Sequence, residues 1–168
     1  MIDTTRFKPK TVYVIYIAAA PEAVWQALTD PAFTRRYFGG FAIEVEPKTG
    51  GVFRMLHSDG RVHIRGEVVD WSPPRRFSCT WVVEGMSETR DLPACLVTYD
   101  VEQAGGSVRL TMTEAHQWDV PDAILSGGRA GWPAILSSLK SVLETGRPLS
   151  IEMAPPQEML EALKARKR

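Results

Sequence analysis

The chain has 168 residues, with 20 basic and 20 acidic side chains, so its formal net charge is zero. This length fits one domain with a short tail, and 44% hydrophobic residues can form a core without disulfides or metals. The even charge balance argues against nucleic-acid binding, which needs a basic surface. No apolar run reaches the roughly 20 residues of a membrane helix, and the N-terminal segment does not have the pattern of a secretory signal. We therefore expect a cytoplasmic protein that does not enter membranes.

The first elements predicted along the chain are a strand and two short helices. Residues 11–18 are rich in β-branched and aromatic side chains, which is typical of a strand. Pro21 fits the first turn of a helix that has to end before Pro31, because proline disfavours helical geometry at the residue before it. Asp30 is then the N-cap of a second short helix.

A hairpin is predicted after a short strand over residues 41–46, with the Asp59-Gly60 dipeptide at its turn. The register that follows pairs Phe53 with Gly66, Met55 with Ile64 and His57 with Val62. This register makes one face apolar, which supports it. It also places His57 and His63 on opposite faces, so these two imidazoles are not expected to share a metal ion.

A second hairpin is predicted at Gly105-Gly106, after a strand over residues 77–83 and a polar loop. On the inner face its register pairs Val101 with Leu110, Tyr99 with Met112 and Val97 with Glu114. On the outer face Glu102 lies opposite Arg109, and opposite charges across strands support the register. Seven strands with short links predict one curved antiparallel sheet whose outer face contacts water.

The C-terminal part is predicted to be helical. A short helical turn follows Pro121 and is expected to stop at Gly127-Gly128. The main helix then runs from about Ala130 to Thr145, with apolar side chains at helical spacing. We expect a single domain over residues 1–147, followed over residues 148–168 by a linker and a short terminal helix.

Two segments carry a family resemblance: V-W-x-A-L-T-D-P at residues 24–31 and P-P-R-R-F-x-x-T-W at residues 73–81. With the order of the elements, they make residues 11–147 resemble the START-like (SRPBCC) superfamily. Within it the chain is most similar to the family of the activator of the heat-shock-protein-90 ATPase. The resemblance implies an α+β helix-grip fold, with a curved seven-stranded antiparallel sheet wrapped around a long C-terminal helix. It also implies two short helices between the first two strands, and a cavity for an apolar ligand.

Glu114 and His116 are the most informative polar residues, because both fall on the buried side of the last strand. A buried carboxylate is costly unless it is solvated or has a partner. Glu114 is therefore expected to point into a wet or ligand-filled cavity, or to bond a neighbour such as Tyr99. It could serve as a polar anchor for a ligand, as a general base assisted by His116 or Tyr99, or as a structural carboxylate.

The residues expected to bind a ligand share the inward-facing positions of the sheet and the main helix. They are Phe53, Met55, His57, Trp81, Tyr99, Met112, Glu114, His116 and Trp132. In an ordinary sandwich the apolar ones would simply be core. No Cys or His spacing matches a zinc site, and Cys79 and Cys95 lie in apolar runs typical of buried free thiols. We expect no metal and no cofactor.

Three functions remain open from the sequence. The first is a carrier or sensor that binds a small apolar or aromatic ligand. The second is a cyclase- or hydrolase-like enzyme with Glu114 as base. The third is a chaperone-linked or regulatory interaction module, in which an apolar stripe of Met159, Leu160 and Leu163 would contact a protein partner. That stripe could instead pack on the domain or on a second copy of the chain.

Overall fold

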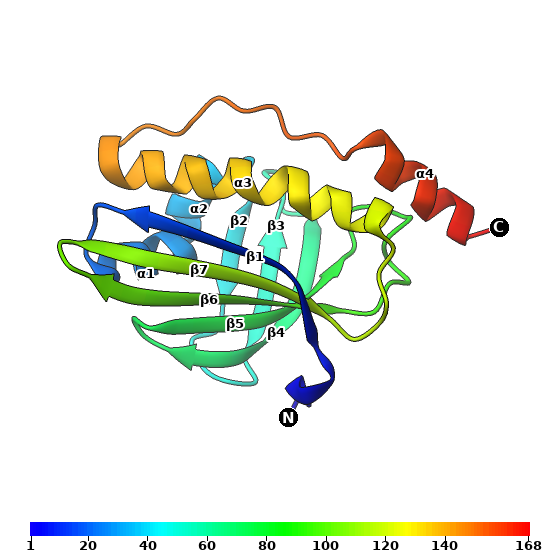
Figure 1. The fold of residues 1–168 in the computed structure, drawn as a ribbon, viewed down its shortest axis with the longest axis horizontal. Helices are drawn as coiled ribbons and strands as arrows, with labels where there is room; N and C mark the ends of the chain where they lie inside the picture. Colours follow the sequence, from blue (N-terminus) through cyan, green and yellow to red (C-terminus); the bar gives the residue numbers. More distant parts are fainter.

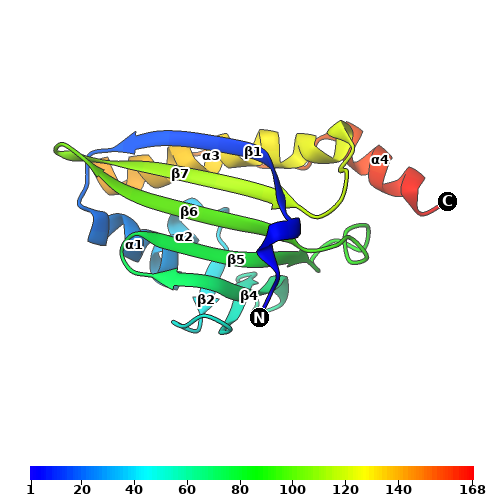
Figure 2. The ribbon, with the colours of Figure 1, turned by 60° about the horizontal axis from the view of Figure 1, so that its bottom comes forward.

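The computed structural model describes residues 1–168 and contains one seven-stranded antiparallel sheet in the order β1-β7-β6-β5-β4-β3-β2. The strands are β1 (Lys8–Ile17), β2 (Ala42–Val45), β3 (Val52–Leu56), β4 (Val62–Ser72), β5 (Arg76–Val83), β6 (Cys95–Ala104) and β7 (Ser107–His116). The helices are α1 (Pro21–Thr29), α2 (Pro31–Tyr37), α3 (Asp122–Thr145) and α4 (Gln157–Arg166). Figures 1 and 2 show α3 lying across one face of the curved sheet, with α1 and α2 near one end. The α+β helix-grip prediction is confirmed.

The two short helices begin and end where the sequence predicts. Pro21 occupies the first turn of α1, and the Asp30 side chain caps α2 by accepting a hydrogen bond from the Ala32 backbone N–H at 2.7 Å. The buried Tyr37 hydroxyl at the end of α2 donates to the Ala27 carbonyl of α1 at 2.8 Å. This bond joins the two helices into one unit beside the sheet.

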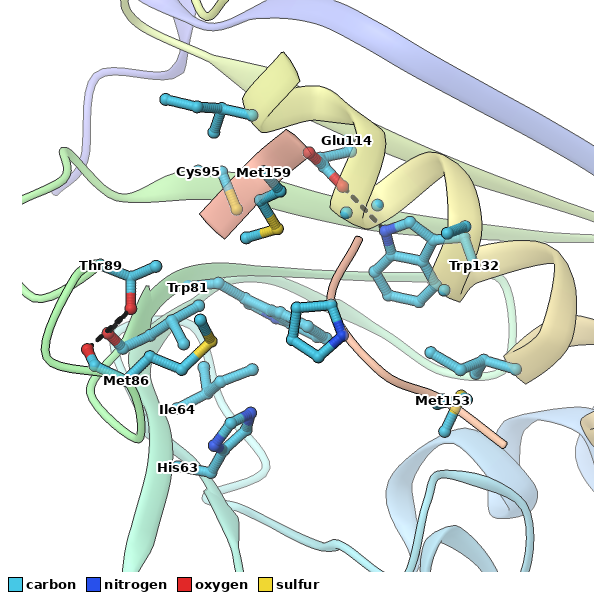
Figure 3. Close-up of a pocket in the computed structure, with 18 of the residues that line it drawn as sticks. His63, Ile64, Trp81, Met86, Thr89, Cys95, Glu114, Trp132, Met153 and Met159 are labelled. Carbon is cyan, nitrogen blue, oxygen red and sulfur yellow. Dashed lines mark hydrogen bonds between the residues drawn. The ribbon is translucent and has the colours of Figure 1, made fainter. Parts of the chain in front are cut away.

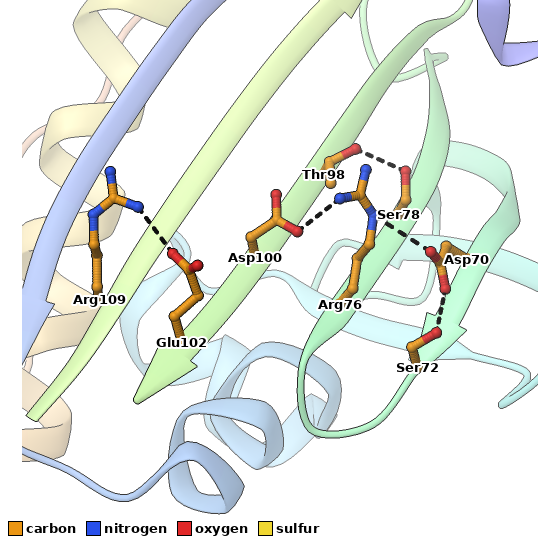
Figure 4. A network of polar contacts seen from close by, with 8 residues as sticks. All are labelled: Asp70, Ser72, Arg76, Ser78, Thr98, Asp100, Glu102 and Arg109. Atoms are coloured by element: carbon orange, nitrogen blue, oxygen red, sulfur yellow. Dashed lines mark hydrogen bonds and ion pairs between the residues drawn. The ribbon is translucent and has the colours of Figure 1, made fainter. Parts of the chain in front are cut away.

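The β6–β7 hairpin has the predicted register. Tyr99 lies opposite Met112 on the inner face, and Glu102 lies opposite Arg109 on the outer face. The Arg109 guanidinium donates to the Glu102 carboxylate at 2.9 Å. On the same outer face Arg76 forms ion pairs with Asp70 at 3.3 Å and with Asp100 at 2.8 Å (Figure 4).

The β3–β4 hairpin departs from the predicted register near its turn. Met55 faces Ile64 as expected, but a bulge then pairs Leu56 with Val62 and leaves His63 without a partner in the ladder. The ring centroids of His57 and His63 therefore lie 4.9 Å apart, and the prediction that they point to opposite faces is wrong. The two imidazoles belong to no group of three or more candidate metal ligands.

Helix α3 is a single element of 24 residues, so the predicted stop at Gly127-Gly128 is wrong. A side chain at either glycine would collide with a neighbour. A Cβ atom at Gly127 would lie 2.2 Å from the Met159 sulfur, and one at Gly128 would lie 2.9 Å from Glu114 Oε2. Close packing thus explains why glycines occupy helical positions where their intrinsic propensity is about 1 kcal/mol worse than that of alanine.

The C-terminal tail lies against the domain that precedes it. Leu163 of α4 is 1% exposed and packs with Ile124 and Leu125 of α3. Residues 150–155 run back along α3 toward α4 without any backbone hydrogen bond (Figure 1). None of the helices combines the length and the apolar character needed to cross a membrane.

Candidate functional site

A cavity of about 390 Å³ lies between α3, the inner face of the sheet and the C-terminal tail. Of the 31 residues that line it, 21 are hydrophobic, as in most sites for small molecules. Aromatic side chains form the inner walls: Phe38, Phe41, Trp81 and Trp132. Four of the six methionines of the chain also line it: Met55, Met86, Met153 and Met159. Figure 3 shows Trp81 between Glu114 and His63, with Met153 on the tail segment that crosses in front.

A polar cluster in this wall is centred on Glu114 of β7. The indole N–H of Trp132 on α3 donates to Glu114 Oε2 at 2.8 Å (Figure 3). The Nε2 atom of His116 lies 2.8 Å from the other carboxylate oxygen, Oε1. The side chains of Glu114 and His116 are 13% and 12% exposed, so water reaches little of the cluster. Two fixed donors therefore hold the carboxylate that the sequence predicts on this face.

Of the alternatives expected for Glu114, the side chain lies at a cavity wall and bonds neighbours, but Tyr99 is not one of them. Tyr99 is 3% exposed and stacks on Phe77 within the core, with ring centroids 6.1 Å apart. The carboxylate instead joins β7 to α3 through Trp132. The hydrogen bond between Trp132 and Glu114 therefore connects α3 to the sheet at the cavity wall.

His116 has one nitrogen engaged and one free. A carboxylate only accepts hydrogen bonds, so its contact with Nε2 places a hydrogen on that nitrogen. The second nitrogen, Nδ1, is buried and has no hydrogen-bond partner in the protein. In the Glu114–His116 pair the carboxylate therefore fixes the orientation of the imidazole ring and the position of its hydrogen.

The charge of Glu114 acts on the groups around it. Burial raises the pKa of the Cys95 thiol well above its usual value, and the nearby Glu114 carboxylate raises it further. The pKa of Tyr13 is raised by the same two causes. Burial also raises the pKa of Cys79 to about 12, so neither cysteine has thiolate character.

The structure brings together five of the predicted ligand-binding residues at the cavity wall. They are Met55, Trp81, Glu114, His116 and Trp132. Phe53, Tyr99 and Met112 are almost completely buried in the core, and His57 is not part of the wall. Ligand binding by any of these residues stays a prediction.

Several lining residues were not among the predicted ones. His63 enters the wall because of the bulge, and its ring stacks on Phe41 with centroids 4.4 Å apart. The tail contributes Met159 and the segment 151–155. The sequence signals for the tail are the apolar stripe of Met159, Leu160 and Leu163 and the apolar residues of the segment before it, Ile151 among them.

A curved antiparallel sheet that holds a long C-terminal helix, with a cavity between the two, defines a START-like helix-grip protein. Residues 18–144 match the model of the family described as "Activator of Hsp90 ATPase homolog 1-like protein". The chain belongs to this family. No curated protein sequence matches the chain.

Several solved structures share the fold. DynU16, from the dynemicin biosynthetic locus, is 25% identical with a TM-score of 0.69. That match covers 82% of this chain and 48% of DynU16, so this chain spans about half the length of that relative. CalU16 from Micromonospora echinospora is 21% identical, with a TM-score of 0.63 and coverage of 95% and 90% of the two chains. The Aha1 dimer from Colwellia psychrerythraea is 17% identical, with a TM-score of 0.62 and coverage of 80% and 96%.

Proposed function

We propose that this protein binds a small, mainly apolar molecule in the cavity between the sheet and α3, as a carrier or sensor. The observation that carries the proposal is a cavity of about 390 Å³ with a mainly hydrophobic wall and one buried polar cluster at Glu114. A site of this composition takes up apolar surface and orients the ligand through few polar contacts.

Binding is tested by calorimetry and thermal shift with fused-ring aromatic probes such as naphthalene derivatives. The expected result is saturable binding with a rise in Tm, because a ligand that binds only the folded state stabilises it. Ala134→Phe fills part of the wall and should abolish binding, whereas Ala165→Phe on the exposed side of α4 should preserve it. Absence of binding by the unmodified protein across such a panel would contradict the proposal.

A second candidate is a cyclase- or hydrolase-like enzyme, favoured by the contact between Glu114 and His116. In this candidate the roles expected from the sequence are exchanged: Glu114 orients the imidazole, and His116 is the base through Nδ1, which is buried and reaches a substrate only when the wall around it opens. With an identified substrate, His116→Gln should then abolish turnover and Glu114→Gln should reduce it. Turnover that survives His116→Gln would remove this candidate.

The interaction-module hypothesis loses part of its basis, because Met159 and Leu163 pack against the domain. The tail still exposes Leu149, Ile151 and Met153. The relative from Colwellia is described as a dimer. Light scattering after size exclusion would establish whether this chain also pairs with a second copy.

A further inference from the structure

The cavity wall contains carboxylates but no cationic side chain of lysine or arginine. Its ionisable residues are His63, Cys95, Glu114, His116 and Glu152. The basic residues of α3 are engaged elsewhere: Arg129 binds Asp122 at 3.1 Å, and Lys140 binds Glu144 at 2.7 Å. No lysine or arginine in the wall is therefore available to neutralise an anionic ligand.

A carboxylate ligand would meet two unfavourable conditions in this cavity. It would lose its hydration among mainly hydrophobic side chains, and it would face the buried Glu114 carboxylate in a wall that holds no lysine or arginine. Repulsion of this kind excludes a ligand more effectively than a missing contact does.

An amine or a hydroxyl would meet the opposite conditions. The Glu114 carboxylate offers about four acceptor positions, of which Trp132 and His116 occupy one each. A donor on the ligand can therefore add to the cluster without displacing a bond.

We propose that the cavity selects apolar molecules whose polar end is a hydrogen-bond donor, an amine or a hydroxyl, and rejects carboxylates. Glu114 is the specificity-determining residue, and it acts through its charge at the cavity wall. This inference rests on the proposed ligand-binding function.

The experiment measures the affinities of three probes with the same apolar body: 2-(2-naphthyl)ethylamine, 2-(2-naphthyl)ethanol and 2-naphthylacetate. Calorimetry at neutral pH should give at least tenfold tighter binding of the amine than of the carboxylate, with the alcohol between them. Glu114→Gln should reduce the difference between amine and carboxylate to less than threefold. Glu44→Gln removes the same charge from an exposed position on β2 and should leave the difference unchanged.

A charge introduced into the wall gives an independent test. Met86 lies in the half-exposed loop that lines the cavity, so Met86→Lys is compatible with folding. It should strengthen binding of 2-naphthylacetate at least tenfold relative to the amine. If Glu114→Gln fails to fold, this variant still tests whether charge at the wall controls the selection, and an unchanged ratio of the amine and carboxylate affinities would overturn the inference.

The possible failures are distinguishable. If none of the three probes binds the unmodified protein, the proposed function fails and this inference fails with it. If 2-naphthylacetate binds as tightly as the amine, or if the preference persists in Glu114→Gln, the inference is overturned and ligand binding stands.

Discussion

The two faces of the sheet hold their charges in different ways. On the outer face several of them are paired with opposite charges: Arg76 lies between Asp70 and Asp100, and Glu102 contacts Arg109. On the inner face β7 carries Glu114, which is held by an indole and an imidazole rather than by a lysine or arginine. Water screens the outer pairs, so they contribute little to stability, whereas the inner carboxylate depends on fixed donors. Substitutions at the inner cluster should therefore cost far more than substitutions at the outer pairs.

The largest effect is expected from Trp132→Ala. It removes a side chain that is 4% exposed and also deprives Glu114 Oε2 of its donor. Truncation of a buried tryptophan typically costs about 3–5 kcal/mol in the free energy of unfolding. Urea denaturation measures the loss, and Trp132→Phe, which keeps a ring but no donor, separates packing from hydrogen bonding. A decrease of less than about 1 kcal/mol in the free energy of unfolding of the alanine variant would contradict a large contribution of the inner cluster to stability.

An intermediate effect is expected from Gly128→Ala, whose new methyl group would lie 2.9 Å from Glu114 Oε2. Overpacking of this kind costs about 1–3 kcal/mol. The matched control is Gly131→Ala in the same helix, where a Cβ meets nothing within 4 Å. The control should gain up to about 1 kcal/mol from helix propensity, so the two variants should change the urea midpoint in opposite directions.

A smaller, pH-dependent effect is expected at His63. Burial lowers the pKa of His63 below its usual 6.5, so the unfolded chain binds the proton more tightly than the folded one. The stability that follows is present above pH 6.5 and is lost as the pH falls through the folded-state pKa. His63→Phe should therefore flatten the decline of the urea midpoint between neutral and acidic pH. An unchanged decline in this variant would assign the acid sensitivity to other groups.

The smallest effect is expected on the outer face. Glu102→Gln breaks an ion pair whose partners are both largely exposed, and solvent screens such pairs. The urea midpoint should stay within experimental error of the unmodified protein at moderate salt. A clear loss of stability here would contradict the distinction between the two faces.

Most of the fold can be read from the alternation of apolar residues. This pattern correctly predicts the β6–β7 register, and Pro21 and Pro31 predict the two ends of α1 and the start of α2. The bulge at His63 cannot be predicted from this pattern, because one extra residue near a turn leaves the alternation of apolar and polar residues on either side intact. The alternation of apolar residues also does not predict that α3 is continuous. The space beside Gly127 and Gly128 is limited by residues that are remote in sequence.

The candidate site is only partly predictable for the same reason. Glu114 and Trp132 follow from strand parity and helical spacing, so their inward direction is a local property. Of the two partners of Glu114, His116 is local on β7, whereas Trp132 depends on how α3 crosses β7. The sequence suggests Tyr99 only because that residue is a near neighbour in the hairpin. The part of the cavity wall that the tail forms depends on where the tail packs against α3. The spacing of apolar residues in the sequence does not specify that position.

The tail segment over residues 150–155 has a consequence for how the cavity opens. Its backbone makes no hydrogen bonds, and it covers the cavity through side chains such as the exposed Ile151 and Met153. Its detachment therefore breaks no strand pairing and no turn of α3. Local opening of this kind needs much less free energy than global unfolding. The entrance to the cavity, which is already partly open, can thus widen while the sheet and α3 stay folded.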